Sequence, residues 1–214
     1  MKAAVLGANT DLGRRIVLRA EEEGINVTSI VSTPADLAGN GPIIIKEPQE
    51  LEVRELSRFH VFIDALSFPQ IRSFKRGEEP LSQLQQKLAE AGTIYLGVGD
   101  CSLLYTDESR TQLTAESDLL QAMGGGSSDP RRCLELYQRM LCWPDLRWIL
   151  FCPPLLLDTH SYGRGRFELT GNVLPIGLDG SSRIALSDFV SALIELLKVR
   201  SALNTCISVR GLQP

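Results

Sequence analysis

Short apolar runs alternate with segments of helical period along most of this chain. The runs are about four to six residues long, as expected of strands that are buried on both faces. They lie at 2–6, 26–31, 42–45, 61–65, 93–98, 147–152 and 206–209. Parallel strands need crossover helices between them, and such crossovers are right-handed. The alternation therefore predicts an α/β fold with a doubly wound, mostly parallel sheet.

The segments between these runs have the apolar spacing of amphipathic helices. The first is predicted over 11–23, and a second is predicted to begin at Pro80, which is favoured at the first position of a helix. Ser187 is predicted to be the N-cap of another helix. A further helix is expected to begin at Pro130, after a glycine-rich segment at 123–129 that favours irregular structure.

Composition limits the classes of protein to which the chain can belong. A chain of 214 residues without repeats or charge blocks predicts a single domain over 1–214. Its net charge of −4 disfavours nucleic acid as a partner. The longest apolar stretch, 148–157, is interrupted by Pro153 and Pro154 and is too short to cross a membrane. Five cysteines without a C-x-x-C pair, and an N-terminus without a secretory signal, predict a cytoplasmic protein.

One local motif carries a chemical mechanism. The sequence Ala-Val-Leu-Gly-Ala-Asn-Thr-Asp-Leu-Gly at 4–13 predicts a strand, a tight turn and the start of a helix. Unpaired N–H groups and the positive end of a helix meet in such a Rossmann-type turn, where they can bind the pyrophosphate of a dinucleotide. The predicted cofactor-binding residues are Gly7, Asn9, Thr10, Asp11, Leu12, Gly13 and Arg14.

Thr10 stands where the usual pattern has its central glycine, and its side chain is expected to crowd the cofactor. The alternative is a tight turn without a ligand, in which Gly13 only lets the helix pack on the strand. The second strand ends at Ser32 and Thr33, with neither an acid for a ribose hydroxyl nor a base for a 2′-phosphate. Both side chains are candidate ligands, and Arg14 favours NADP over NAD unless it belongs to a solvated helix face.

Beyond this turn, four separated blocks resemble one known group of proteins. They lie at 2–31, at 91–103 with Gln112 and Leu113, at 145–154 with 163–169, and at 180–193. In order and spacing the chain is similar to the atypical short-chain dehydrogenase/reductases of the NAD(P)H-binding, NmrA-like group. Within that group it is similar to bacterial proteins described as candidate NADH-flavin reductases. The resemblance implies a Rossmann-like fold with a small C-terminal region on the substrate side.

The resemblance also implies where the nicotinamide would lie. It assigns that side of the site to three segments. These are 65–67, which is Ala65, Leu66 and Ser67, then 98–102, which begins at Val98, and then 153–155, which begins at Pro153. Ser102 corresponds to the serine of the glycine-rich turn of the group and is the candidate catalytic residue. The implied partners are a nucleotide cofactor, NADP or NAD, and a small-molecule acceptor, with FMN or FAD as the candidate substrate.

Classical members of the superfamily reduce carbonyl groups with a tyrosine four residues before a lysine. The four tyrosines here, at 95, 105, 137 and 162, are followed at that spacing by Gly99, Ser109, Leu141 and Arg166. Carbonyl reduction is therefore disfavoured. Hydride transfer to a flavin needs only stacked positioning, because flavin accepts hydride directly. His60 and His160, the only histidines, have no metal-ligand spacing.

Three functions are compatible with these residues. The first is an NAD(P)H-dependent oxidoreductase acting on a flavin or quinone-like acceptor. The second is a dinucleotide-sensing or vestigial binding protein, in which occupancy changes partner binding without turnover. The third is a structural module in which Thr10 has closed the phosphate turn. Binding of NADPH or NADH separates the third from the others, and flavin reduction separates the first from the second.

Overall fold

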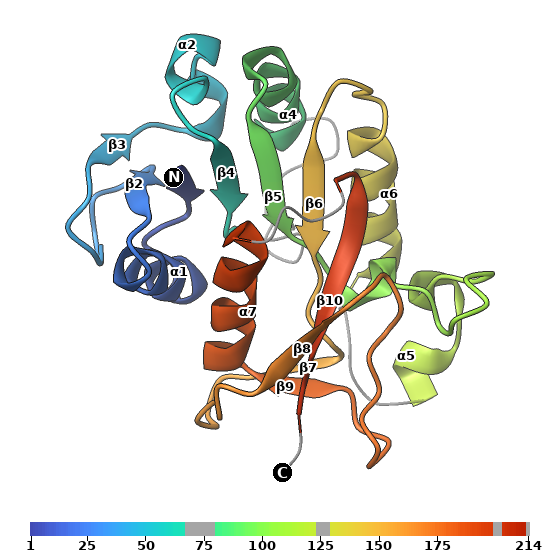
Figure 1. Cartoon of the computed structure of the whole chain (residues 1–214). Coiled ribbons are helices and arrows are strands. Elements are labelled where there is room, and N and C mark those ends of the chain that lie inside the picture. Colours follow the sequence, from blue (N-terminus) through green and yellow to red (C-terminus); the bar gives the residue numbers. More distant parts are fainter. Residues whose placement is uncertain (67–79, 123–128, 199–202, 213–214) are drawn as a thin grey trace. The chain divides into compact units, whose positions relative to one another are not determined.

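The structure is a computed structural model that describes residues 1–66, 80–122, 129–198 and 203–212 (Figure 1). Its strands are β1 (Lys2–Leu6), β2 (Asn26–Val31), β3 (Ile43–Ile45), β4 (Val61–Asp64), β5 (Ile94–Val98), β6 (Trp148–Phe151), β7 (Leu156–Asp158), β8 (Phe167–Thr170), β9 (Arg183–Ala185) and β10 (Thr205–Gly211). Its α-helices are α1 (Asp11–Glu22), α2 (Val53–Leu56), α4 (Pro80–Ala91), α5 (Leu119–Ala122), α6 (Pro130–Met140) and α7 (Leu186–Lys198). Short 3₁₀ helices are η1 (Pro48–Glu50), η3 (Cys101–Leu103) and η4 (Thr114–Glu116).

The main sheet has eight strands in the order β3-β2-β1-β4-β5-β6-β10-β8. Strands β3, β2, β1, β4 and β5 pair in parallel, and β8 is antiparallel to β10. Strands β7 and β9 form a separate parallel pair. The order 3-2-1-4-5-6 is that of the doubly wound dinucleotide-binding fold. The predicted α/β class and mostly parallel, Rossmann-like sheet are therefore confirmed.

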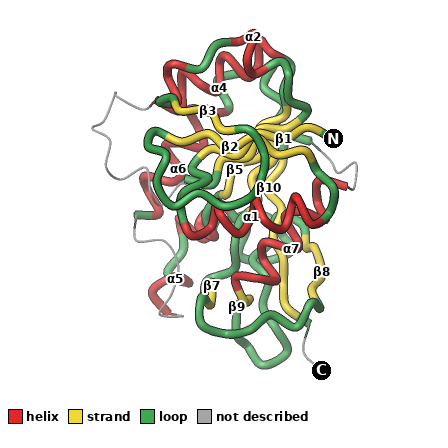
Figure 2. The backbone as a smooth tube through the Cα atoms, turned by 90° about the vertical axis from the view of Figure 1, so that its left-hand side faces the viewer, coloured by secondary structure: helices red, strands yellow, loops and turns green. Residues whose placement is uncertain are grey.

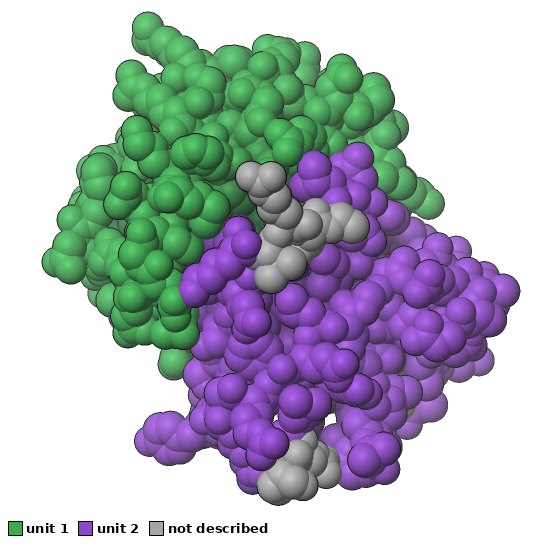
Figure 3. Space-filling view, viewed as in Figure 1, with its two compact units in different colours: residues 1–98, 138–149 green, residues 99–137, 150–214 purple. Residues whose placement is uncertain are grey.

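The chain divides into two compact units, which Figure 3 shows in different colours. Unit 1 consists of 1–98 and 138–149, and unit 2 consists of 99–137 and 150–214. The single domain expected over 1–214 stays a prediction.

In unit 1 the central strands are apolar because both of their faces are covered. Every residue of β4 is buried, as are the last four of β5. Helix α1 contacts β1 and β2 (Figure 2) and buries Ile16, Val17 and Ala20. The helix is followed by Gly24, whose φ of 72° is the left-handed conformation that ends many helices.

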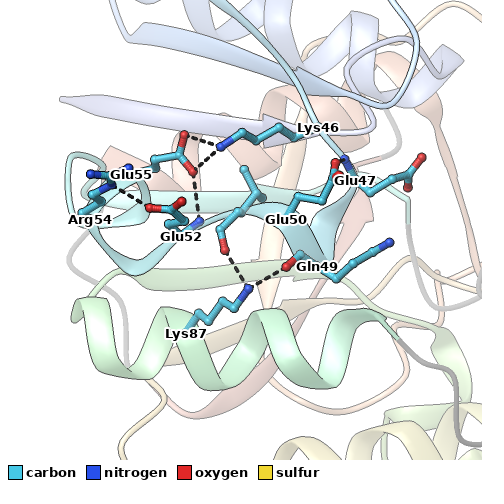
Figure 4. Close-up of polar contacts among 9 residues, drawn as sticks. Lys46, Glu47, Gln49, Glu50, Glu52, Arg54, Glu55 and Lys87 are labelled. Carbon is cyan, nitrogen blue, oxygen red and sulfur yellow. Dashed lines mark hydrogen bonds and ion pairs between the residues drawn. The ribbon is translucent and has the colours of Figure 1, made fainter.

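Polar contacts fix the connections of unit 1 that lie between β3 and β4 (Figure 4). The Lys87 ammonium on α4 donates to the carbonyl oxygens of Gln49 at 2.6 Å and of Leu51 at 2.8 Å. Lys46 donates to both carboxylate oxygens of Glu55, at 2.8 and 2.9 Å. The hydrogen bond from Lys46 lowers the pKa of Glu55. Two lysine side chains therefore satisfy backbone and carboxylate groups in these short segments.

Two sequence predictions need correction or qualification. Helix α7 begins at Leu186, so Ser187 lies inside it and is not its N-cap. Instead, the Ser187 hydroxyl accepts a hydrogen bond of 2.9 Å from the backbone N–H of Gly163. The helices predicted from Pro80 and Pro130 are present. Of the segment predicted to be irregular, 123–128 lie outside the described residues.

The cysteines are thiols and differ sharply in burial. Unit 2 contains four of them, and all four are buried, whereas Cys142 of unit 1 is exposed. The buried ones are Cys101, Cys133, Cys152 and Cys206. Burial raises the pKa of the Cys152 thiol well above its ordinary value. These four side chains therefore behave as small apolar core residues in unit 2.

Candidate functional site

The turn between β1 and α1 is built by close packing of backbone on backbone. Gly7 has a φ of 72°, a conformation that favours glycine, and its N–H donates to the carbonyl oxygen of Ile30 at 3.0 Å. Gly13, in the first turn of α1, lies so near this loop that a Cβ there would overlap the carbonyl oxygen of Gly7. The two glycines therefore hold the start of α1 directly against the end of β1.

This packing leaves backbone donors without partners. The N–H groups of Asn9, Asp11 and Leu12 form no hydrogen bond to any part of the chain that the structure describes. Asp11 and Leu12 are the first residues of α1, where the helix dipole adds a partial positive charge. Buried or ligand-facing N–H groups in this arrangement are ready donors for an anion.

Thr10 is the N-cap of α1. Its hydroxyl accepts from the N–H of Gly13 at 3.0 Å and donates to the carbonyl oxygen of Gly7 at 2.8 Å. The side chain therefore satisfies one of the free N–H groups of the helix and ties the helix to the turn. The sequence pattern does not indicate this capping role, and the expected crowding of a cofactor by Thr10 stays a prediction.

The end of β2 lies next to this turn. The Asn9 amide donates to the carbonyl oxygen of Thr33 at 3.5 Å, and both Ser32 and Thr33 are exposed. Arg14 bends back over the turn, with hydrogen bonds of 3.4 Å to the Asn9 carbonyl oxygen and to the Asp11 carboxylate. Thus the structure brings the predicted residues from Gly7 to Arg14 close to the predicted residues that follow β2 in unit 1.

Asp64, at the end of β4, is a site residue that the sequence patterns do not single out. It pairs in register with Leu6, the residue before the glycine turn, and its carboxyl group is 1% exposed. One oxygen accepts from the Tyr95 hydroxyl at 2.8 Å and the other from the Leu66 N–H at 3.1 Å. The second bond holds Leu66 so close to Gly7 that a Cβ at Gly7 would lie 2.5 Å from the Leu66 side chain.

Burial raises the pKa of Asp64 from its ordinary 3.8 to about 6, although the hydrogen bonds from Tyr95 and Leu66 act in the opposite direction. Burial likewise raises the pKa of the Tyr95 hydroxyl well above its ordinary value. An acid at the end of the otherwise apolar run Val-Phe-Ile-Asp-Ala-Leu is the signal that would have found this group. Through its hydrogen bond, Asp64 holds the backbone of Leu66 beside the turn.

The remaining predicted cofactor residues differ in accessibility. Ala65 and Val98, of unit 1, are buried, whereas Leu66 is half-buried. Ser67 lies outside the described residues. Pro153, of unit 2, is half-buried and follows Cys152, whose N–H pairs with β10. Unit 1 therefore holds the glycine turn and most of the predicted cofactor-binding residues, while Pro153 and Ser102 lie in unit 2.

Ser102, the predicted catalytic residue, lies in η3 of unit 2. Its side chain is 0% exposed, and its hydroxyl oxygen has no hydrogen-bond partner within the described residues. Asp100 lies two residues before Ser102 and is the N-cap of η3. Its carboxylate accepts a hydrogen bond of 2.9 Å from the Ser102 N–H. A buried hydroxyl without a partner costs about 1–3 kcal/mol, so its presence calls for an explanation.

We expect the substitution Ser102→Ala to stabilise the protein by about 1 kcal/mol, because it removes a buried polar group that no hydrogen bond compensates. The matched control is Ser208→Ala in the same unit. The Ser208 hydroxyl is equally buried but donates to the carbonyl oxygen of Cys152 at 2.8 Å. Urea unfolding should show opposite signs for the two variants. A loss of stability in Ser102→Ala would mean that the hydroxyl is already satisfied.

Two other polar side chains, Asp158 and His60, accept hydrogen bonds from backbone N–H groups. Asp158 accepts from the backbone N–H groups of His160 and Ser161, at 2.9 and 3.0 Å, and so fixes its own loop. The imidazole of His60 accepts from the Lys2 N–H at 3.1 Å. Within the described residues there is no group of three or more His, Cys, Asp or Glu side chains that could hold a metal ion. Among those same residues, no helix is long and apolar enough to span a membrane.

Comparison with known proteins gives structural relatives only. No family model matches the chain, and no curated protein matches it. A candidate NADH-flavin reductase from Streptococcus pneumoniae has a similar structure, with a TM-score of 0.77, 23% identity, and coverage of 99% of this chain and 100% of the other. A candidate epimerase from Bacteroides thetaiotaomicron gives a TM-score of 0.77 at 17% identity, covering 100% and 98% of the two chains.

A Rossmann-fold NAD(P)-binding family protein from Shigella flexneri is a more distant relative, with a TM-score of 0.54, 13% identity, and coverage of 98% and 93%. Identities this low carry information about the fold and not about the reaction. The chain is therefore a Rossmann-like α/β protein, and its resemblance to the atypical short-chain dehydrogenase/reductases is confirmed at the level of the fold.

Proposed function

We propose that this protein binds NADPH or NADH at the β1–α1 turn and reduces a flavin or quinone-like acceptor. The observation that carries the proposal is the set of unpaired N–H groups at Asn9, Asp11 and Leu12, at the positive end of α1. An N–H cradle at a helix N-terminus, with glycines that allow close approach, suits a pyrophosphate. Solved structures with this fold include proteins named for NADH or NAD(P), which supports the same class of cofactor.

The neighbouring residues favour NADP. The pyrophosphate would take the N–H donors, and the exposed Ser32 and Thr33 would lie toward the adenosine ribose, as the ends of second strands do in this fold. No carboxylate stands there to accept from a ribose 2′-hydroxyl. Arg14 supplies a guanidinium beside the turn, and its 3.4 Å contact with Asp11 is between exposed groups and therefore weak.

The proposed acceptor follows from the missing acid. Carbonyl reduction needs a proton donor, and the tyrosines lack the lysine spacing, while the Tyr95 hydroxyl is buried and donates to Asp64. A bound nicotinamide supplies hydride, which a flavin accepts without a protein acid, since solvent can provide the proton. The name of the Streptococcus pneumoniae relative agrees with a flavin acceptor.

A second candidate function is dinucleotide sensing without turnover. It is favoured by the complete burial of the Ser102 hydroxyl, which leaves the only predicted catalytic group out of reach of a substrate in this structure. In that case Ser102 would be a structural residue of η3. Binding of the cofactor is common to both candidates, and only the reduction of an acceptor distinguishes them.

The binding step is tested by removing one donor of the cradle. Asp11 is the first residue of α1, a position where proline is tolerated because the N–H has no intrahelical partner. We expect Asp11→Pro to weaken NADPH binding about tenfold, as the loss of one charge-assisted hydrogen bond implies. Asp11→Asn is the control, because it removes the same carboxylate and keeps the N–H. Calorimetric titration with NADPH and NADH measures both variants.

Equal affinity of the two Asp11 variants for NADPH, or no binding of NADPH or NADH by the wild-type protein, would contradict the proposed binding site. The reaction is then tested by anaerobic mixing of the NADPH-loaded protein with FMN, FAD or a soluble quinone. Loss of reduced-nicotinamide absorbance above the buffer rate supports the reductase. Tight binding of NADPH, together with a rate of nicotinamide oxidation equal to that in buffer alone, supports the sensor instead.

A further inference from the structure

A cavity of about 430 Å³ lies wholly within unit 2. Residues from β7, β9, β10, the start of α7 and the loops beside these elements line it. Its charged lining residues are Arg164, Arg166, Arg183, Arg210, Asp158, Asp179 and Asp188. The volume falls in the range of small-molecule sites. Four guanidinium groups and three carboxylates therefore share this wall.

Each carboxylate of the cavity accepts hydrogen bonds from backbone N–H groups of a loop. Asp188, on α7, is buried and accepts from the N–H groups of Arg164 and Gly165, both at 2.9 Å. Asp158 likewise accepts from the loop that follows β7. Asp179 accepts from the N–H of Ser181 at 3.0 Å and from its hydroxyl at 2.8 Å. These hydrogen bonds fix the backbone geometry of the cavity wall.

The arginines divide into two classes. Arg210 pairs with Glu168 through two donors, at 2.9 and 2.6 Å. In contrast, the side chains of Arg164, Arg166 and Arg183 make no ion pair or hydrogen bond within the described part of the chain. The cavity therefore carries guanidinium groups with unused donors.

These guanidinium groups project from anchored backbone. Asp188 fixes the backbone at Arg164, and the Arg166 carbonyl oxygen accepts from the Leu212 N–H at 2.9 Å. Arg183 is held in the β7–β9 pair, in register with Leu156. A Cβ at Gly163 would overlap the Asp188 carboxylate, so the glycine allows the loop to close on α7. Fixed points of attachment reduce the entropy that a ligand must overcome.

We propose that this cavity binds the oxyanion of a small molecule, a phosphate or a carboxylate, through Arg164, Arg166 and Arg183. A guanidinium presents a planar fork of donors that matches either group in a bidentate manner. The Tyr162 ring also lines the cavity and is 97% exposed, so it offers an apolar face to the rest of the ligand. The proposal concerns unit 2 alone and does not depend on the cofactor proposed above.

The test uses the full chain labelled with fluorotyrosine, because Tyr162 reports on the cavity and the other tyrosines do not line it. Its ¹⁹F resonance is assigned with Tyr162→Phe. Inorganic phosphate and succinate are titrated separately at constant ionic strength, with chloride as the reference anion. We expect the Tyr162 resonance to shift and saturate with phosphate, succinate or both. The anion that binds more tightly identifies the chemistry of the ligand.

Arg183→Gln and Arg164→Gln should each raise the dissociation constant about tenfold, as expected for loss of a charge-assisted hydrogen bond. Arg131→Gln is the matched control, because Arg131 is exposed on α6 of the same unit and does not line the cavity. Unchanged resonances of the other tyrosines show that each variant is folded. The proposal would be overturned if the Tyr162 resonance shifted with neither anion. It would also be overturned if Arg183→Gln and Arg131→Gln bound the anion with equal affinity.

Discussion

Gly13→Ala is expected to destabilise the protein by about 3 kcal/mol or more. Helix propensity alone would predict the opposite sign, since alanine is about 1 kcal/mol better than glycine inside a helix. The added Cβ, however, would overlap the carbonyl oxygen of Gly7. That oxygen cannot move freely, because it accepts from both the N–H and the hydroxyl of Thr10, at 2.9 and 2.8 Å. Relief therefore requires α1 to separate from β1, which is severe overpacking.

Gly171→Ala is the control for this prediction. A Cβ at Gly171 would have no atom within 4 Å, and the backbone there has a conformation that alanine can adopt. Tryptophan fluorescence in urea is the measurement, because Trp143 and Trp148 both belong to unit 1, like Gly13. The Gly171 variant should unfold at the same urea concentration as the wild type. If Gly13→Ala does so too, the proposed contact between helix and turn is wrong.

Asp64→Asn is expected to change the pH dependence of stability. With a pKa of about 6 in the folded protein and 3.8 when unfolded, Asp64 binds its proton more tightly in the folded state. The wild type should therefore lose stability as pH rises from about 4 to 6, by up to about 3 kcal/mol for a shift of roughly two units. Asparagine does not ionise, so the variant should lack this loss.

The difference between variant and wild type should accordingly grow in favour of Asp64→Asn between pH 4 and pH 7, as measured by urea unfolding at each pH. A constant offset between the two curves reports altered hydrogen bonding to Tyr95 and Leu66, whereas the slope reports ionisation. Asp145→Asn, at an exposed position of unit 1, is the control, and its curve of unfolding free energy against pH should be parallel to that of the wild type. Parallel curves for Asp64→Asn as well would contradict the buried, proton-retaining carboxyl group.

Most strands of the main sheet could be predicted because burial on both faces makes them continuously apolar. Strand β8 of the same sheet was not predicted, because its residues are half-buried or exposed. The runs at 2–6 and 26–31 match β1 and β2 to the residue. The pair β7 and β9 could not be predicted in this way, because each strand has only three residues, one of them charged, and so gives no continuous apolar run. The position of Ser187 was misjudged because its hydroxyl binds Gly163, which is 24 residues away.

Much of the candidate site could also be predicted, since a glycine turn between a strand and a helix is a local motif. The residues from Gly7 to Arg14 lie together for that reason. The role of Asp64 could not be read locally, because it depends on the pairing of β4 with β1 and on Tyr95, which is 31 residues away. The cavity of unit 2 was missed for the same reason, as its arginines meet only when β9, β10 and the loop before β8 fold together.

The uneven burial of the cysteines gives the protein an internal reporter of its own unfolding. A maleimide dye can react with one exposed thiol in the native chain, that of Cys142 in unit 1, whereas the thiols of unit 2 are buried. Alkylation beyond one equivalent therefore records the opening of unit 2, at a rate set by how often that unit opens. Tryptophan emission records unit 1 in the same sample, so the order in which the units open can be followed without introducing a label by mutation.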